Sequence, residues 1–158
     1  MQIFVTSPSP ADSANRLWQQ PNRARKMITE TMQILACCQQ SLFGGVTITK
    51  ADGTPYKTPK SRMNHPVVIW ARSSVQNTAW LLTHCYALYK RYSGKAFTNI
   101  MPNIKLLTEQ LVQSGCSDLS FDNMQFCNFA KADDKGLDFR HIDDVHEAYN
   151  QFLLAQNA

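Results

Sequence analysis

The 158-residue chain lacks the features that identify several common protein classes. It has no run of 18 apolar residues, which excludes a membrane-spanning helix. The first ten residues, MQIFVTSPSP, have no basic stretch followed by an apolar one and so do not resemble a secretory signal. We therefore expect a cytoplasmic protein without a membrane partner, folded as one domain over residues 1–158.

Motifs for metals and cofactors are also missing. The cysteines are odd in number, two of them are adjacent, and none forms a CxxC pair, which argues against a disulfide framework and against a zinc site. His141 and His146 lie close in sequence but have no third ligand nearby. Walker, GxGxxG, GxSxG and HExxH motifs do not occur. The sequence predicts no metal and no cofactor.

Acidic residues are scarce in the first hundred positions, which hold 12 Lys and Arg but three acids, whereas residues 101–158 hold four Lys and Arg and nine acids. A basic front with an acidic tail favours a polyanionic partner, either DNA or a nucleotide. A basic surface without a dedicated partner is the alternative.

Hydrophobic periodicity predicts a mainly α fold, a compact single-domain helical bundle with a small β-hairpin near 46–58. The hairpin is predicted from VTITKADGTPYKT, in which two β-prone runs flank an Asp-Gly turn. We expect PKSRMNHP to be a basic loop and FDNMQFCNFAKADDKG to be irregular. Helices are predicted at residues 11–20, 23–41, 103–114 and 142–155, and from Ser73 and Ser74 to a stop at Gly94.

Glu30 is the single acid on the basic helix predicted at 23–41. At 100° per residue, one polar stripe about 80° wide beside the buried arc contains Arg23, Lys26, Glu30, Gln33 and Cys37. A carboxylate repels phosphate, so in a cationic site it indicates chemistry: stabilisation of an oxocarbenium-like sugar, or proton transfer while an amine forms a Schiff base. The alternative is a modest i,i+4 ion pair between Lys26 and Glu30.

The predicted long helix supplies further candidates for phosphate or base contacts. Asn77, His84 and Arg91 share one of its faces. His84, which lies between leucines on that face, is either a functional residue or a core histidine with satisfied hydrogen bonds. The full set of candidate phosphate-binding or nucleic-acid-binding residues is Arg23, His65, Arg72, Ser74, Asn77, His84, Arg91 and Lys95.

Four segments, KMITETMQIL, NHPVVIWARSSVQNTAWLLTHCYAL, RYSGKAF and DDVHEAYNQF, resemble a family of small bacteriophage proteins that is placed near the T4-type pyrimidine-dimer DNA glycosylases, also called endonuclease V. The resemblance implies a DNA repair glycosylase and AP lyase of the host cytoplasm. It also implies an N-terminal α-amine as nucleophile and a glutamate on an early helix. Glu30 matches that glutamate, and Met1 supplies the amine.

The chain departs from the T4 type at its N-terminus. There the initiator methionine is removed to expose a small residue, whereas Gln2 is bulky, so we expect Met1 to remain. Lys26 is the alternative amine, if burial lowers its pKa. The catalytic candidates are therefore Glu30, Met1 and Lys26.

Two other functions fit the same residues. One is a non-catalytic phage protein that binds a nucleotide or nucleic acid, for example against a host defence system. The other is an enzyme that modifies free nucleotides. A DNA enzyme needs an open basic groove and salt-sensitive affinity, whereas a nucleotide binder needs an enclosed pocket of a few hundred Å³.

Overall fold

The computed structural model describes residues 1–94, 96–116 and 120–156. In these residues the fold is mainly helical with a small two-stranded antiparallel hairpin, which confirms the predicted fold class. The elements are α1 (Pro10–Leu17), α2 (Pro21–Phe43), α3 (Lys60–Met63), α4 (Pro66–Arg72), α5 (Val75–Lys90), α6 (Ile100–Gln113), β1 (Lys131–Ala132), the 3₁₀ turn η1 (Asp133–Lys135), β2 (Leu137–Asp138) and α7 (Val145–Ala155).

Local side-chain chemistry sets where these helices begin. Ser9, Ser74 and Asp144 are the N-cap residues of α1, α5 and α7, and each accepts a hydrogen bond from a backbone N–H in the first turn of its helix. Pro21 stands at the start of α2, where its missing N–H costs no helical hydrogen bond. The segment PKSRMNHP, predicted as a loop, contains the single helical turn α3.

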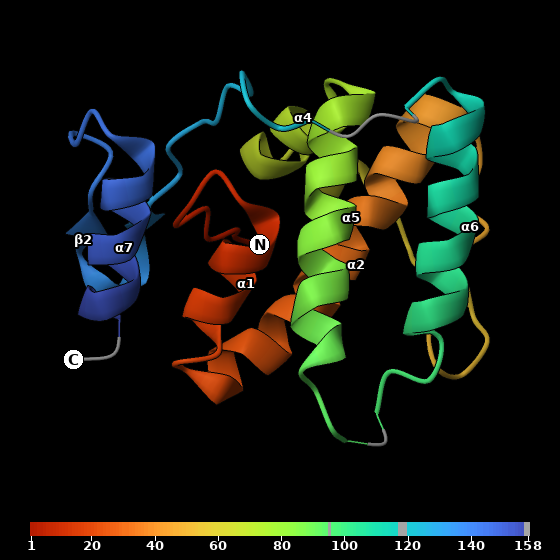
Figure 1. Ribbon diagram of the computed structural model, residues 1–158, viewed down its shortest axis with the longest axis horizontal. Coiled ribbons are helices and arrows are strands. Elements are labelled where there is room, and N and C mark those ends of the chain that lie inside the picture. The colour runs from red at the N-terminus through yellow and green to blue at the C-terminus, as the bar shows by residue number, and fades with distance from the viewer. Residues whose placement is uncertain (95, 117–119, 157–158) are drawn as a thin grey trace.

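Helices α2 and α5 form the centre of the bundle. Helix α5 packs against α1, α2, α4 and α6, while α6 lies at one end of the molecule and α7 with the hairpin at the other (Figure 1). The N-terminal segment Ile3–Val5 forms no strand but is buried. Its Phe4 ring stacks on Phe152 at 5.6 Å and so attaches α7 to the bundle.

The hairpin predicted near 46–58 is reduced to one isolated antiparallel bridge between Thr49 and Pro55. Pro55 has no N–H to donate, so the ladder cannot extend past it. The backbone instead bonds to helix side chains: Ile48 N–H donates to Gln39 Oε1 at 3.2 Å, and Thr49 N–H to Asn103 Oδ1 at 3.1 Å. The segment is thus held as a strap over α2 and α6.

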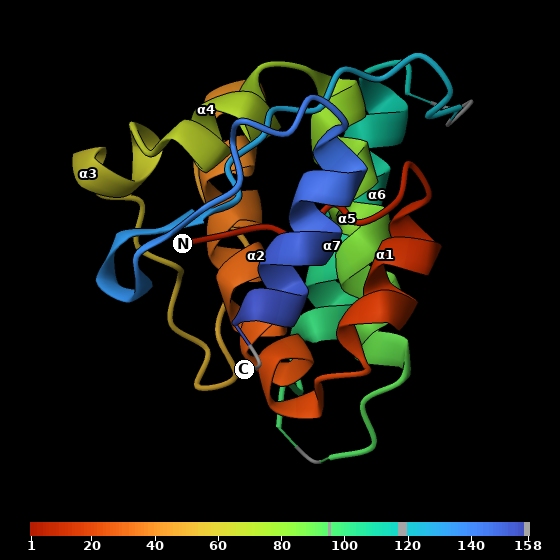
Figure 2. The same cartoon turned by 90° about the vertical axis from the view of Figure 1, so that its left-hand side faces the viewer.

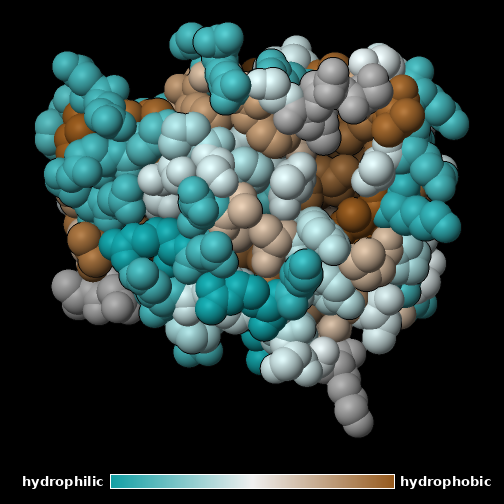
Figure 3. Space-filling view, in the orientation of Figure 1, coloured by the Kyte–Doolittle hydropathy of each residue, from teal (hydrophilic) through white to brown (hydrophobic). Residues whose placement is uncertain are grey.

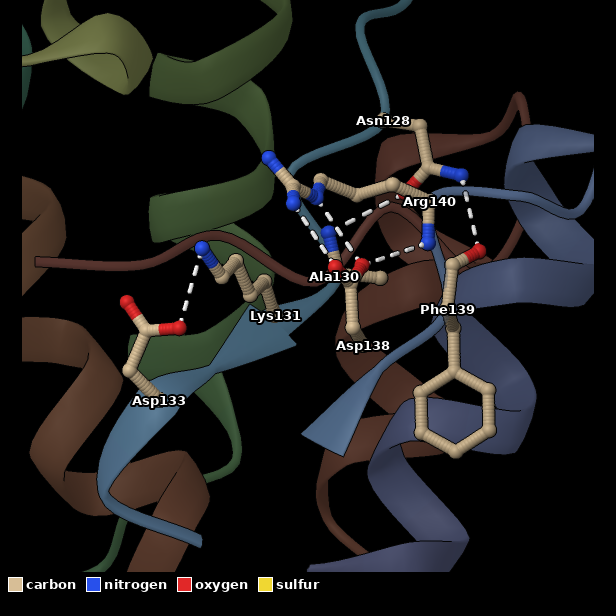
Figure 4. A network of polar contacts seen from close by, with 7 residues as sticks. All are labelled: Asn128, Ala130, Lys131, Asp133, Asp138, Phe139 and Arg140. Atoms are coloured by element: carbon tan, nitrogen blue, oxygen red, sulfur yellow. Dashed lines mark hydrogen bonds and ion pairs between the residues drawn. The ribbon is translucent and has the colours of Figure 1, made fainter. Parts of the chain in front are cut away.

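The first strand of the two-stranded ladder lies in the segment that was expected to be irregular, and the second strand follows directly after it. Strand β1 pairs with β2 through Lys131 opposite Asp138 and Ala132 opposite Leu137. Phe139 N–H donates to the carbonyl of Ala130 at 2.8 Å and extends the pairing (Figure 4). Gly136 adopts a left-handed conformation, φ 65°, which ends η1 and turns the chain into β2.

Ion pairs brace both strands of this hairpin. Lys131 Nζ lies 2.9 Å from Asp133, and Arg140 donates to the Asp138 carboxylate at 2.7 Å (Figure 4).

Within the described ranges, no helix combines the length and the hydrophobicity needed to cross a membrane.

Candidate active site

A cleft of about 480 Å³ opens where the N-terminal segment, α2, the hairpin and the end of α7 meet. We call it the N-terminal cleft. Figures 1 and 2 both place the N-terminus between α2 and the β1–β2 hairpin. The lining residues are Met1, Gln2 and Phe4 from the N-terminal segment, Asn22, Arg23, Lys26, Met27 and Glu30 from α2, Lys131, Ala132, Asp134 and Lys135 from the hairpin, and Phe152 and Gln156 from the C-terminal region.

Three predicted catalytic residues, Met1, Lys26 and Glu30, therefore meet in one cleft. Lys26 Nζ lies 3.5 Å from Glu30 Oε1, so the i,i+4 ion pair considered above is present. The second carboxylate oxygen, Oε2, accepts the backbone N–H of Gln2 at 3.1 Å. Only 18% of the Glu30 side chain is exposed, whereas 71% of the Lys26 side chain is exposed, so Lys26 lacks the burial that its role as the alternative amine requires. The carboxylate is thus held from two sides, by its own helix and by the chain terminus.

Gln2 fixes the N-terminal residue in this position. Its Nε2 donates to the carbonyl of Phe129 at 2.8 Å, and its Oε1 accepts the N–H of Ile3 at 2.9 Å. Together with the bond to Glu30, these contacts tie the first peptide to both α2 and the segment before β1. Sequence analysis considered only the bulk of Gln2 and missed this role, since no pattern marks a contact with Phe129 that spans 127 positions.

Arg23 is a partly buried cation at the edge of the same cleft. Its guanidinium lies 5.5 Å from the centre of the Phe4 ring, and its Nε donates to Gln20 Oε1 at 2.9 Å. Burial lowers the pKa of Arg23, and the nearby charge of Glu30 opposes that shift. A cation that has lost part of its hydration binds an anion more strongly than one in open water.

His65 lies within electrostatic reach of the site without lining the cleft. Burial lowers its pKa, the α-ammonium of Met1 lowers it further, and Glu30 acts in the opposite direction. His65 is the N-cap of α4, where its Nδ1 accepts the backbone N–H of Val67 at 3.2 Å. An accepting Nδ1 carries no proton, so neutral His65 has its proton on Nε2.

The other candidate residues are not brought to the cleft. Arg72 donates to the carbonyl of Met63 at 3.3 Å. Ser74 caps α5 through the backbone N–H of Asn77, and the Asn77 side chain donates to the carbonyl of Trp70 at 2.8 Å, at the end of α4. Arg72 therefore links α4 to α3, and Ser74 and Asn77 support the α4–α5 junction.

His84 is the satisfied core histidine among the alternatives considered. It is 2% exposed, stacks on Trp80 at 5.1 Å, and its Nδ1 lies 3.0 Å from the carbonyl of Pro10. Because a carbonyl only accepts, Nδ1 carries the proton. Burial lowers the pKa of His84 to about 4. Arg91 donates to Asn15 at 3.1 Å on the surface, and Lys95 lies outside the described residues.

Lys131, Lys135 and Asp134 were not among the sequence candidates. They come from the acidic tail, yet they place two of its cations beside the basic helix α2. The cleft lining thus contains four cationic side chains and two carboxylates. The sequence carries no signal for this arrangement, because it depends on how the hairpin packs against the N-terminus.

A second hollow of about 490 Å³ lies between α5 and α6, visible as a brown recess in Figure 3. Its lining has no Asp, Glu, Lys or Arg. Thr83 and Thr108 line it but donate their hydroxyls to carbonyls of their own helices, at 2.9 and 2.7 Å. Of these two hollows, only the N-terminal cleft is lined by charged side chains.

No group of three or more His, Cys, Asp or Glu residues in the described part of the chain could hold a metal ion.

The cleft thus combines the terminal amine, the Lys26 amine and the Glu30 carboxylate with three further cations and a second carboxylate, Asp134. Such a set can bind an anion, form an imine with a carbonyl-type carbon, and move a proton. Comparisons with protein-family models, with curated proteins and with solved structures found no match for this chain.

Proposed function

We propose that this protein is a DNA N-glycosylase with AP lyase activity, which acts through an amine and a carboxylate in the N-terminal cleft. The observation that carries the proposal is that Met1 lines the same cleft as Lys26 and Glu30, with the Gln2 N–H bonded to Glu30. The resemblance of KMITETMQIL to the early helix of the pyrimidine-dimer glycosylases supports the same reaction.

The α-amine of Met1 attacks C1′ of the target nucleotide while the N-glycosidic bond breaks. The base leaves with the bonding electron pair and takes up a proton. After the amine nitrogen loses a proton, its lone pair expels the ring oxygen and forms the imine. Loss of a C2′ proton then expels the 3′ phosphate by β-elimination, and water hydrolyses the imine to restore the amine.

Glu30 has two possible tasks in this sequence. Its carboxylate stabilises the positive charge that develops on the sugar as the base departs, and it can carry the proton between the amine and the ring oxygen. Both tasks need a carboxylate close to the amine. The Gln2 contact supports this placement, because it holds Glu30 one peptide unit from the Met1 nitrogen.

The size of the cleft limits how DNA enters. A volume of about 480 Å³ is suited to one nucleotide and is far too small for a duplex. The target nucleotide must therefore leave the base stack, as it does in other enzymes that act on bases in DNA.

The same volume favours a second candidate function. Small-ligand sites typically measure about 300–1,000 Å³, and the cleft falls in this range. A non-catalytic protein that binds a nucleotide, as a phage protein could against a host defence, needs only the cations of the cleft and no reactive amine.

Borohydride trapping tests the proposed function. The protein is incubated with UV-irradiated duplex or with abasic duplex, and borohydride is added to reduce any imine to a stable amine. We expect a covalent protein–DNA band that is lost in Glu30→Gln and retained in the matched control Glu109→Gln, which changes an exposed acid on α6.

Peptide mapping of the band then identifies the amine. Modification of Met1 assigns the α-amine, and modification of Lys26 together with loss of the band in Lys26→Arg assigns the lysine. If neither duplex gives a band, the glycosylase proposal is overturned and the nucleotide-binding function takes its place.

A further inference from the structure

The β1–β2 hairpin brings two cations to the N-terminal cleft from the wall opposite α2. Lys131 and Lys135 line the cleft together with Arg23 and Lys26 of α2. The charge of Lys131 is partly compensated by Asp133 at 2.9 Å. Among the ion pairs of the described residues Lys135 has none. A cation that lines a cleft and has no carboxylate partner among the described residues is available to an anionic ligand.

The two most available cations of the cleft stand on different elements. Arg23 projects from the first turns of α2 and is held by Gln20 and by the face of the Phe4 ring. It makes no ion pair within 4.0 Å among the described residues, whereas Lys26 is paired with Glu30. Arg23 on one wall and Lys135 on the other can therefore share one anion between them.

We infer that Arg23 of α2 and Lys135 of the hairpin, with Lys131 beside it, form a two-walled site for a single phosphate ester of a nucleotide. The inference deepens the proposed function and rests on it for the nucleotide part of the ligand. Phe4, Met27 and Phe152 also line the cleft but are at most 3% exposed, so the ligand contacts come mainly from the charged side chains above them.

The carboxylates of the cleft limit how much negative charge it accepts. Glu30 and Asp134 line the same cleft and repel any phosphate beyond the one that the free cations can neutralise. The site should therefore prefer a monophosphate or a backbone diester over a triphosphate. Two substitutions should therefore have opposite effects: removing the charge of Asp134 should strengthen binding, and removing the charge of Lys135 should weaken it.

Binding of a short fluorescein-labelled oligothymidylate, measured by fluorescence anisotropy, tests the phosphate site without any chemical step. We expect Lys135→Gln to weaken binding about tenfold at low salt and to lower the slope of log affinity against log salt by about 0.7. Asp134→Asn should tighten binding several-fold. The matched control Lys105→Gln removes an equal charge from the exposed face of α6, outside the cleft, and should change neither quantity.

Competition identifies where the phosphate comes from. If thymidine monophosphate displaces the oligonucleotide and inorganic phosphate does so more weakly, the ligand is a free nucleotide. If only a longer oligonucleotide competes, the phosphate belongs to a nucleic-acid backbone. Either result supports the site, provided that Lys135→Gln weakens it. Equal binding by Lys135→Gln and Lys105→Gln overturns the inference, and so does a thymidine triphosphate that binds more tightly than the monophosphate.

The outcomes separate this inference from the proposed function. A protein that gives no borohydride-trapped band but loses oligonucleotide affinity in Lys135→Gln has the phosphate site without the lyase reaction. A protein that gives the band, with affinity unchanged in Lys135→Gln, has the reaction but not this phosphate site. Thermal unfolding of each variant controls for misfolding, which is not expected because Lys135 is exposed.

Discussion

Two regions of the molecule contain residues predicted to bind or act on a ligand: the N-terminal cleft, and the group formed by Ser74, Asn77 and His84, which we call the α4–α5 face. They differ in what those residues contact. In the cleft, Glu30 contacts the chain terminus and is surrounded by cations of two other elements. On the α4–α5 face, Ser74, Asn77 and His84 bond to backbone atoms of nearby helices and of Pro10. The charged groups of the cleft face a hollow that a ligand can enter, whereas the polar groups of the α4–α5 face are used in hydrogen bonds within the protein.

The difference shows what helical spacing can and cannot predict. Asn77, His84 and Arg91 do lie along one side of α5, but their surroundings differ. Asn77 bonds to α4, His84 is in the core and Arg91 is on the surface. Helical spacing predicts that side chains point the same way, but not what they contact. The unbalanced charge around Glu30 led to residues that line one cleft, because a lone acid among cations needs either a pairing partner or a function.

The largest expected effect is the loss of chemistry in Glu30→Gln. We expect imine formation on abasic duplex to fall at least about 100-fold, as is typical when a positioned acid or base is removed. The free energy of unfolding should change by less than about 1 kcal/mol, because the Lys26 pair is exposed on one side and the Gln side chain can still accept the Gln2 N–H.

Single-turnover trapping rates and urea unfolding of the same samples measure the two quantities. If the variant keeps its trapping rate but loses several kcal/mol of stability, Glu30 has a structural role, like the residues of the α4–α5 face. Glu109→Gln serves as the control for a lost surface charge.

His84 should show the opposite signature, an effect on stability that depends on pH. Its pKa in the folded protein is lowered to about 4, so the unfolded chain binds more protons between pH 4 and its ordinary pKa of about 6.5. The free energy of unfolding is therefore highest above pH 6.5, falls as the pH drops through this window, and levels off below about 4. The contribution lost is roughly 3 kcal/mol.

Urea unfolding between pH 4 and 7, compared with His84→Gln, isolates this contribution from that of the carboxylates. The variant should have a flatter pH profile by about the same amount, because glutamine does not titrate. Parallel profiles for the two proteins would show that His84 does not carry the pH dependence.

Much of the fold could be predicted from the sequence because its signals are local. The N-cap Ser74 and the start of α2 at Pro21 follow from residue types next to each other in the chain. The hairpin could not be placed, because the strand-like run at 47–49 bonds to Gln39 and Asn103, which lie on other helices. Its β-propensity is real, but side chains distant in sequence satisfy its backbone first.

The candidate site was half predictable for the same reason. Arg23, Lys26 and Glu30 are neighbours on one helix, so their shared stripe is visible in the sequence. The other wall comes from Lys131 and Lys135, more than a hundred residues later, and it is placed there by the packing of Phe4 against α7 and by the hydrogen bond from Gln2 to Phe129. Tertiary contacts of this range leave no periodic pattern.

A smaller effect is expected from Gln2→Leu, which keeps the side chain's size and removes its two hydrogen bonds. The terminal amine should then sample more positions around Glu30, and the trapping rate should fall about tenfold, a loss typical of a misplaced reactive group. Leucine is bulky enough to keep Met1 in place, which intact mass spectrometry verifies. An unchanged trapping rate, as in the exposed control Gln151→Leu, would leave Gln2 without a positioning role.

The smallest effect is expected for Ser74→Ala, which tests whether the α4–α5 face has only a structural role. Ser74 Oγ accepts the N–H of Asn77 at 3.0 Å as the cap of α5, and its loss in Ser74→Ala should cost about 1 kcal/mol of stability. Oligonucleotide affinity and trapping should stay within twofold of the wild type, since Ser74 does not line the cleft. If affinity instead falls while stability is kept, the α4–α5 face binds the ligand after all, and its hydrogen bonds in the free protein are exchanged for contacts with that ligand.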